Sequence, residues 1–81
     1  MSTLTGPQIR SARAALGITV AELSKLSDVS ARTIARIEAV DGVSSSTSAN
    51  LNAIRSALEN AGIEFIQTHD GGRGVLFRPP R

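Results

Sequence analysis

Hydrophobic residues recur at helical spacing through most of this 81-residue chain and change to short strand-like runs near its end. The first helical signal is the capping box Thr5-Gly6-Pro7-Gln8, with proline in the first turn, where its missing N–H costs nothing. One apolar stripe then follows at spacings of three and four residues: Ile9, Ala12 and Leu16. Gly17 supplies a C-terminal stop. The pattern predicts a helix that begins after Thr5 and ends at Gly17.

Two shorter helical segments follow directly. Thr19-Val20-Ala21-Glu22 is a second capping box, and we assign the apolar face of its helix to Val20, Leu23 and Leu26. Ser30 caps the next segment, which runs from Ala31 to about Ala39 and turns two residues inward, Ile34 and Ile37. Because helices this short are not stable alone, they must pack at a steep angle on a shared core. This arrangement is a helix-turn-helix over about residues 20–39.

A polar loop and a longer helix complete the helical part of the chain. The segment 40–48 is rich in Ser, Asp and Gly, and we interpret it as a loop rather than a domain linker. The next apolar stripe predicts the longest helix, which stops at Gly62; its members are Leu51, Ile54, Ala57, Leu58 and Ala61.

The residues after Gly62 have β-type patterning. Segments 63–68 and 75–78 are rich in strand formers, and the glycine-rich segment 69–74 between them is typical of a hairpin turn. Pro79-Pro80 ends the second strand. An isolated hairpin is marginal in water, so its apolar residues need a covering surface. Either the preceding helix or a second protomer supplies it, and the candidate dimer contacts are Phe65, Ile66, Leu76 and Phe77.

Composition describes a globular chain and excludes several kinds of site. Hydrophobic residues make up 41% and charged residues 20%, which is ordinary for a folded domain. Without cysteine there is no disulfide, thiolate zinc site or thiol nucleophile, and the single His69 excludes a histidine cluster within one chain. Two Phe without Tyr or Trp offer little for stacking single-stranded bases. We therefore expect no enzyme, no cofactor and no metal.

Hydropathy indicates the cellular location of the protein, and charge indicates the kind of partner that it binds. No apolar run approaches the roughly 20 residues of a membrane span, and residues 1–8 lack the features of a signal peptide. We therefore expect a cytoplasmic protein with no membrane partner. The net charge is only +2, yet eight of the nine basic residues are arginine. Arginine binds phosphate and guanine in bidentate fashion, so this bias favours an anionic partner.

The segments 16–24 and 29–38 resemble the Xre-type, lambda-repressor-like helix-turn-helix regulators. The pattern of that family is matched at Ile18, Thr19, Glu22, Leu23, Val29, Ser30, Thr33, Ile34, Arg36, Ile37 and Glu38. With the flanking helices the resemblance covers about residues 5–61, and the closing hairpin is similar to that of small bacterial members. It implies a mainly α fold, a four-helix lambda-repressor-like helix-turn-helix domain with a C-terminal β-hairpin. We expect a single domain over 1–81, with a DNA-binding core at 5–61 and a dimerisation element at 62–81.

The resemblance also implies site residues, because the second helix of the motif enters the major groove. By position, four residues face the bases: Ala31, Arg32, Ala35 and Arg36. Candidate phosphate contacts, which position the helix without reading sequence, are Thr19, Ser30, Thr33, Ser44, Ser45, Ser46 and Thr47. Relatives form an ion pair between the residues at the places of Arg13 and Glu38, and we expect the same pair here.

Three positions depart from the family pattern. Val20 replaces the usual Gln at the start of the first motif helix, so a common polar contact to DNA is missing and we expect Val20 in the core. Asp28 stands in the turn where Gly is frequent. The loop after the recognition helix is longer and rich in serine, where relatives carry Lys or Arg.

The resulting expectation is a sequence-specific regulator of transcription that binds double-stranded DNA. We expect a homodimeric repressor that reads an inverted-repeat operator and has no small-molecule ligand. Two alternatives remain. One is an antitoxin that regulates its own operon and binds a toxin through the hairpin. The other is a protein-interaction module with weak DNA affinity, which Val20 and the modest +2 charge favour.

Overall fold

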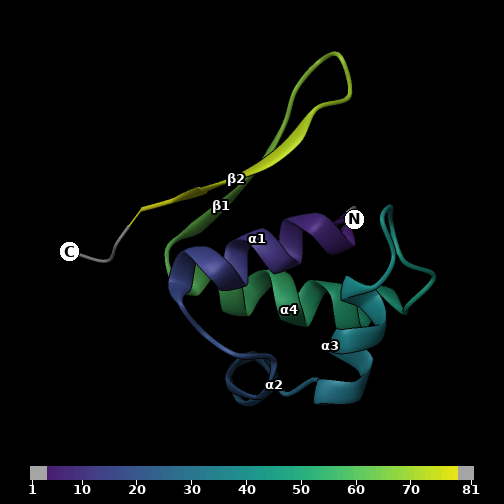
Figure 1. The fold of residues 1–81 in the computed structure, drawn as a ribbon, viewed down its shortest axis with the longest axis vertical. Coiled ribbons are helices and arrows are strands. Elements are labelled where there is room, and N and C mark those ends of the chain that lie inside the picture. Colours follow the sequence, from purple (N-terminus) through teal and green to yellow (C-terminus); the bar gives the residue numbers. More distant parts are fainter. Residues whose placement is uncertain (1–3, 79–81) are drawn as a thin grey trace.

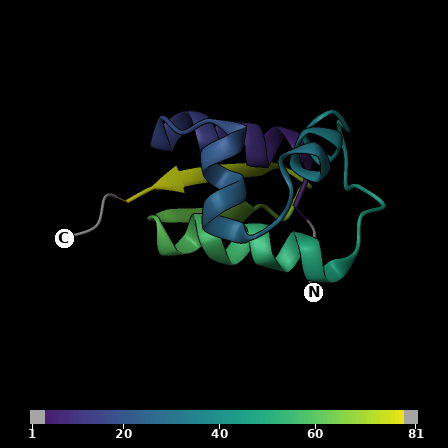
Figure 2. The same cartoon turned by 90° about the horizontal axis from the view of Figure 1, so that it is seen from below.

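The computed structural model describes residues 4–78 and confirms the mainly α fold with a C-terminal hairpin. The elements, in order, are α1 (Gly6–Leu16), α2 (Val20–Ser27), α3 (Ala31–Glu38), α4 (Ser48–Asn60), β1 (Ile63–Gln67) and β2 (Arg73–Phe77). They form three layers: α1 and α4 lie in the middle, with α2 and α3 on one side and the hairpin on the other (Figure 1, Figure 2). The helix-turn-helix and the hairpin thus occupy opposite sides of the molecule. The predicted stop at Pro79-Pro80 lies outside the described residues.

Local capping explains where α1 and α2 begin. The Thr5 hydroxyl accepts the Gln8 N–H at 3.3 Å, and the Gln8 side-chain oxygen accepts the Thr5 N–H at 3.1 Å. The same reciprocal pair joins Thr19 and Glu22, at 3.0 and 2.9 Å. The pKa of Glu22 is lowered chiefly because its carboxylate accepts the Thr19 N–H. Both predicted capping boxes are therefore confirmed.

Two residues in left-handed backbone end the first two helices. Gly17, with φ of 69°, closes α1 and needs no side chain there. Asp28, with φ of 60°, closes α2 and is the one non-glycine residue of the described chain with positive φ. Aspartate tolerates this conformation better than most residues, which lets the tight turn into α3 form without glycine.

The core lies where α2, α3 and the start of β1 meet α1 and α4. Its buried hydrophobic residues are Leu4, Ile9, Ala12, Leu23, Val29, Ile34, Ile37, Leu51, Ile54, Leu58 and Ile63. The assignment of Leu26 to the apolar face of α2 is wrong, because its side chain is 58% exposed. The inward position one turn after Leu23 belongs to Ser27. Its hydroxyl is satisfied there, since it donates to the Leu23 carbonyl at 2.8 Å and accepts the Val29 N–H at 3.3 Å.

The hairpin packs on α1 and α4 through one of its faces. The strands are antiparallel with Ile63 opposite Phe77 and Phe65 opposite Val75. Ile63 is buried, and Phe65 and Val75 pack partly buried against the core, with the Arg55 guanidinium 5.3 Å from the Phe65 ring centre. β2 begins two residues earlier than predicted, because the Thr68 hydroxyl accepts the Gly72 N–H at 2.8 Å and shortens the turn.

Candidate nucleic-acid interface

Helix α3 has one buried face and one open face. Ile34 and Ile37 point into the core and are fully buried. The four residues predicted to face bases are all exposed on the remaining surface of the helix: Ala31, Arg32, Ala35 and Arg36. Residues four apart in a helix lie on the same side, so Arg32 and Arg36 present their guanidinium groups together. The two alanines between and before them leave room for a close approach.

The two arginines of α3 differ from most of the other arginines in having no partner. Within residues 4–78, Arg32 and Arg36 make no hydrogen bond or ion pair to the protein. Arg13, Arg55 and Arg78 each pair with a glutamate. The planar donor fork of Arg32 and Arg36 is therefore available to an external acceptor such as guanine or phosphate.

Hydroxyl groups stand at the N-terminal ends of all three helices around this surface. Thr19, Ser30 and Thr47 each accept the backbone N–H three residues ahead, at 3.0, 3.1 and 3.2 Å. The Ser30 hydroxyl also donates to the Thr33 hydroxyl at 2.9 Å, which leaves the Thr33 hydrogen available as a donor. The predicted phosphate contacts Thr19, Ser30, Thr33 and Thr47 thus also serve as caps or as partners of caps.

The serine-rich loop between α3 and α4 is fixed to the start of α1 rather than forming a loose linker. Val43 forms a β-bridge with Thr5, which ties the loop to the start of α1. The Ser44 hydroxyl accepts the Ser46 N–H at 3.1 Å, and both side chains are half-buried, whereas Ser45 is exposed. The loop follows the C-terminal end of α3, so these serines lie at the end opposite to Ser30 (Figure 1).

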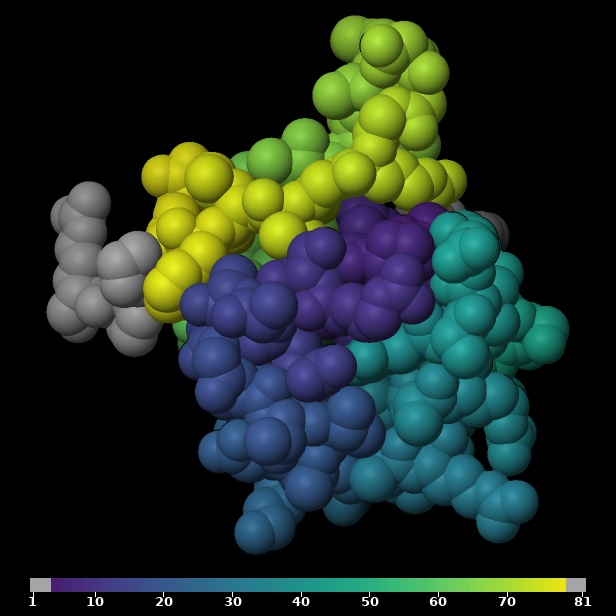
Figure 3. All heavy atoms as spheres, viewed as in Figure 1, coloured from purple at the N-terminus to yellow at the C-terminus, as the bar shows by residue number. Residues whose placement is uncertain are grey.

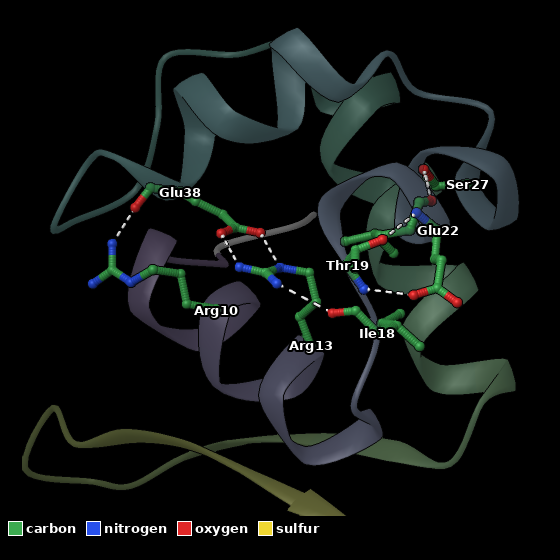
Figure 4. A network of polar contacts seen from close by, with 8 residues as sticks. Arg10, Arg13, Ile18, Thr19, Glu22, Ser27 and Glu38 are labelled. Carbon is green, nitrogen blue, oxygen red and sulfur yellow. Dashed lines mark hydrogen bonds and ion pairs between the residues drawn. The ribbon is translucent and has the colours of Figure 1, made fainter.

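An ion pair fixes α3 to α1. Arg13 donates to the Glu38 carboxylate in bidentate fashion, from Nε at 3.0 Å and from Nη2 at 3.0 Å (Figure 4). The Glu38 side chain is only 7% exposed and raises the pKa of Arg13 through this hydrogen bond. Arg13 also donates from Nη1 to the Ile18 carbonyl at 3.1 Å, which adds the start of α2 to the same cluster. The expected pair is therefore present, and it sets the orientation of the open α3 face.

Two further contacts between α1 and the C-terminal end of α3 were not predicted. Arg10 donates from Nη1 to the backbone carbonyl of Glu38, at the end of the helix where a cation is favoured (Figure 4). Gly6 lies so close to this end that a Cβ atom there would overlap the carbonyl oxygen of Val40. No local sequence signal identifies either contact, because both depend on how α1 packs against α3.

Three further observations concern the packing of Val20, metal binding and membrane spans. Val20 packs partly buried against the core, as expected for the residue that replaces the usual Gln. Among the described residues, no group of His and acidic side chains is suited to hold a metal ion. None of the described helices has the length and apolar character needed to cross a membrane.

The comparisons with known proteins agree with this geometry. A family model described as helix-turn-helix matches residues 9–59, from the first turn of α1 to the last turn of α4. The chain belongs to the Xre-type, lambda-repressor-like helix-turn-helix family. This family is one of DNA-binding regulators of transcription, and the chain is a regulator of that kind. A search of curated proteins gave no match.

The predicted dimer contacts on the hairpin do not form one surface. Phe65 packs inside the chain, which is one of the two arrangements expected for it. Ile66, Leu76 and Phe77 remain 37–39% exposed. Ile66 and Leu76 share the outer face of the hairpin, whereas Phe77 shares the inner face with Ile63 at the strand end. The two exposed apolar residues of β2, Leu76 and Phe77, therefore lie on different faces.

Proposed function

We propose that this protein is a dimeric repressor that reads an inverted-repeat operator with α3 of each copy in the major groove. Arg32 and Arg36 bind guanine edges, and Ala31 and Ala35 bring the helix close to the bases. Hydroxyl groups at the helix ends, together with Ser45, contact phosphates and fix the register without reading sequence. Bound at a promoter, the dimer excludes RNA polymerase and so represses transcription.

One observation carries the proposal: the open face of α3 holds two arginines with no protein partner within residues 4–78. A surface arginine gains little from remaining unpaired, whereas a bidentate bond to guanine is worth about 1–3 kcal/mol of discrimination against other bases. Four-residue spacing brings both side chains to the same stretch of groove. The buried Arg13–Glu38 pair supports this reading, because it holds α3 in a single orientation.

The proposed dimer follows from how little one recognition helix can read. A single helix contacts only a few base pairs, which gives poor discrimination against the many competing sites of a genome. Two copies related by a two-fold axis read two half-sites about one helical turn, or ~34 Å, apart. The palindrome in the DNA then mirrors the symmetry of the protein.

Selection of bound genomic fragments, followed by salt titration of the best site, tests the proposal. The wild type is compared with Arg32→Ala and Arg32→Lys. A matched control is Arg78→Ala, which removes the same charge from the residue that follows β2. The hairpin lies on the side of the molecule opposite to α3 (Figure 1). We expect the wild type and Arg78→Ala to select the same inverted repeat.

The two Arg32 variants separate base reading from charge. Arg32→Ala should flatten the preference at one symmetric pair of positions by about 5- to 150-fold per half-site. Arg32→Lys keeps the charge, so it should retain the salt dependence of binding but lose the same base preference, because lysine lacks the planar fork. Selection of one sequence by all four proteins contradicts the assigned reading. No DNA binding at low salt contradicts the function and favours the protein-interaction module.

A further inference from the structure

Two aspartates of this chain are followed directly by glycine, and the structure places them in different surroundings. The two steps are Asp41–Gly42, in the loop between α3 and α4, and Asp70–Gly71, in the turn of the hairpin. At such a step the next backbone nitrogen can attack the side-chain carboxyl and close a succinimide ring, because glycine has no β-carbon to hinder the approach. The two steps therefore share their chemistry and differ in the contacts that hold them.

The reacting groups of Asp41–Gly42 are accessible and have no partners. Both residues are exposed. Within residues 4–78, neither the Asp41 carboxylate nor the Gly42 N–H makes a hydrogen bond or an ion pair. In Figure 3 the teal atoms of this loop lie at the surface, directly beside the purple start of α1. No contact of the described chain therefore restrains the carboxylate or the amide nitrogen.

The same groups are held in place at the hairpin step. The Asp70 carboxylate accepts the Thr68 hydroxyl and, at 3.4 Å, the Gly72 N–H. The Gly71 N–H donates to the Thr68 carbonyl at 3.2 Å. The bond from the Thr68 hydroxyl is the main cause that lowers the pKa of Asp70, so less of this group is the protonated acid at a given pH. Ring closure here has to break bonds that the loop step lacks.

We propose that Asp41–Gly42 is a site of intramolecular modification, at which the folded chain converts aspartate to isoaspartate. The Gly42 nitrogen bonds to the side-chain carboxyl carbon of Asp41. The nitrogen gives up its proton and the carboxylic acid its hydroxyl group, so one water leaves as the succinimide ring closes. Water then adds to the ring and breaks its bond to the Asp41 backbone carbonyl carbon, which becomes a free carboxylate. The chain now continues through the former side chain, and the two steps together need only water.

Isoaspartate at this position lengthens the backbone where the loop is tied to α1. The Gly42 carbonyl accepts the Gly6 N–H at 3.3 Å, and the next residue, Val43, forms the β-bridge with Thr5. Gly6 has no room to follow a displaced partner, because even a Cβ atom there would overlap the Val40 carbonyl oxygen. The additional backbone carbon therefore releases the loop from the start of α1.

Peptide mapping of the full chain, aged at about pH 5, tests the proposal. At this pH a part of an ordinary aspartate is the protonated acid that ring closure requires. Tryptic peptides 37–55 and 56–73 carry one of the two steps each, and isoaspartate changes the retention of its peptide without changing its mass. Isoaspartate should accumulate at least about tenfold faster in peptide 37–55, because the bonds around Asp70 must break first. Equal rates, or faster reaction at Asp70, overturn the proposal.

Ageing the same chain in urea separates the effect of structure from that of local sequence. In the unfolded chain no contact protects either step, so the two rates should become similar. A difference of the same size in urea assigns it to the neighbouring residues and overturns the structural argument.

Two substitutions change the two steps in opposite directions. A Cβ atom at Gly42 meets open space and the φ of Gly42 is not positive, so Gly42→Ala keeps the fold. It should slow isoaspartate formation at Asp41 roughly tenfold, because the β-carbon hinders the attack. Thr68→Val removes the hydroxyl that holds Asp70 and should accelerate the hairpin step several-fold. No slowing by Gly42→Ala overturns the proposed attack, and no acceleration by Thr68→Val overturns the protection assigned to the turn.

Hydrogen exchange of the isomerised fraction measures the release of the loop. The Gly6 amide should exchange about fivefold faster than in fresh protein, since its partner carbonyl is displaced. Unchanged exchange at Gly6 overturns the release. On the proposed function, this fraction should also bind the selected operator more weakly, whereas aged Gly42→Ala should bind as fresh protein does. Peptide mapping requires no DNA, so failure of the modification and failure of the proposed function are distinguishable.

Discussion

Replacing Arg13 with alanine removes the charge partner of a carboxylate that is almost entirely buried. Glu38 is 7% exposed and receives two hydrogen bonds from Arg13, both at 3.0 Å. Breaking a buried ion pair by removing one partner costs about 3–5 kcal/mol, because the remaining charge stays desolvated and unpaired. Arg13 itself is 25% exposed, which lets water reach part of the site. We therefore expect a loss at the lower end, about 3 kcal/mol.

This loss is large for a domain of this size. A chain of 81 residues has a free energy of unfolding of about 4–12 kcal/mol, so the variant loses a quarter to three quarters of it. Each kcal/mol lowers the melting temperature of such a domain by about 4–8 °C, which gives a decrease of at least about 12 °C. Urea unfolding and calorimetry measure the two quantities.

A double variant distinguishes the charge from the packing. Arg13→Met with Glu38→Met replaces the pair by two apolar side chains, which should lie within about 1 kcal/mol of the wild type. Glu38→Gln should cost about 1–2 kcal/mol, since Arg13 remains partly hydrated. The reasoning is refuted if Arg13→Ala costs less than about 1 kcal/mol, or if the double variant is as unstable as Arg13→Ala.

Three other substitutions test contacts around the same motif. Gly6→Ala forces a Cβ atom onto the Val40 carbonyl, and we expect a loss of about 2–3 kcal/mol in urea unfolding; an unchanged midpoint contradicts the close packing of α1 on α3. Asp28→Gly should raise the free energy of unfolding by about 0.5–1 kcal/mol, because glycine adopts the left-handed backbone without strain; Asp28→Asn serves as the control for charge. The lowered pKa of Glu22 means that its contribution is present above the ordinary carboxyl range and is lost as pH falls through the lowered value. Glu22→Gln should therefore be less stable than the wild type near neutral pH and equally stable in strong acid, as followed by thermal unfolding; a pH-independent difference contradicts this assignment.

Local signals predicted most of the fold because neighbouring residues determine helix ends. Thr5 and Thr19 cap helices with partners only three residues away, so their sequence context is sufficient. The assignment of Leu26 is wrong because spacings of three and four residues both fit a helical stripe, and the buried position after Leu23 belongs to the polar Ser27. The structure shows that a serine satisfied by the helix backbone fits that position.

In the candidate site, too, local patterns predicted some residues, whereas others depend on contacts between distant parts of the chain. The helical period of α3 was sufficient to place Arg32 on its open face, because the buried isoleucines define the opposite one. The contact from Arg10 to Glu38 joins residues 28 positions apart, and it depends on a helix crossing that no local pattern specifies. The Arg13–Glu38 pair was accessible only through the family resemblance, since spacing alone does not bring these residues together.

The small net charge has a consequence for how the proposed complex achieves specificity. Binding through charge alone is independent of sequence, and it grows with the number of phosphates that cations neutralise. This chain carries only +2, and three of its arginines are already paired with glutamates. We therefore expect a low affinity for arbitrary DNA, with a larger share of the binding free energy coming from the proposed base contacts of Arg32 and Arg36. A small repressor gains from this balance, because its occupancy of one operator depends on the ratio of specific to non-specific binding.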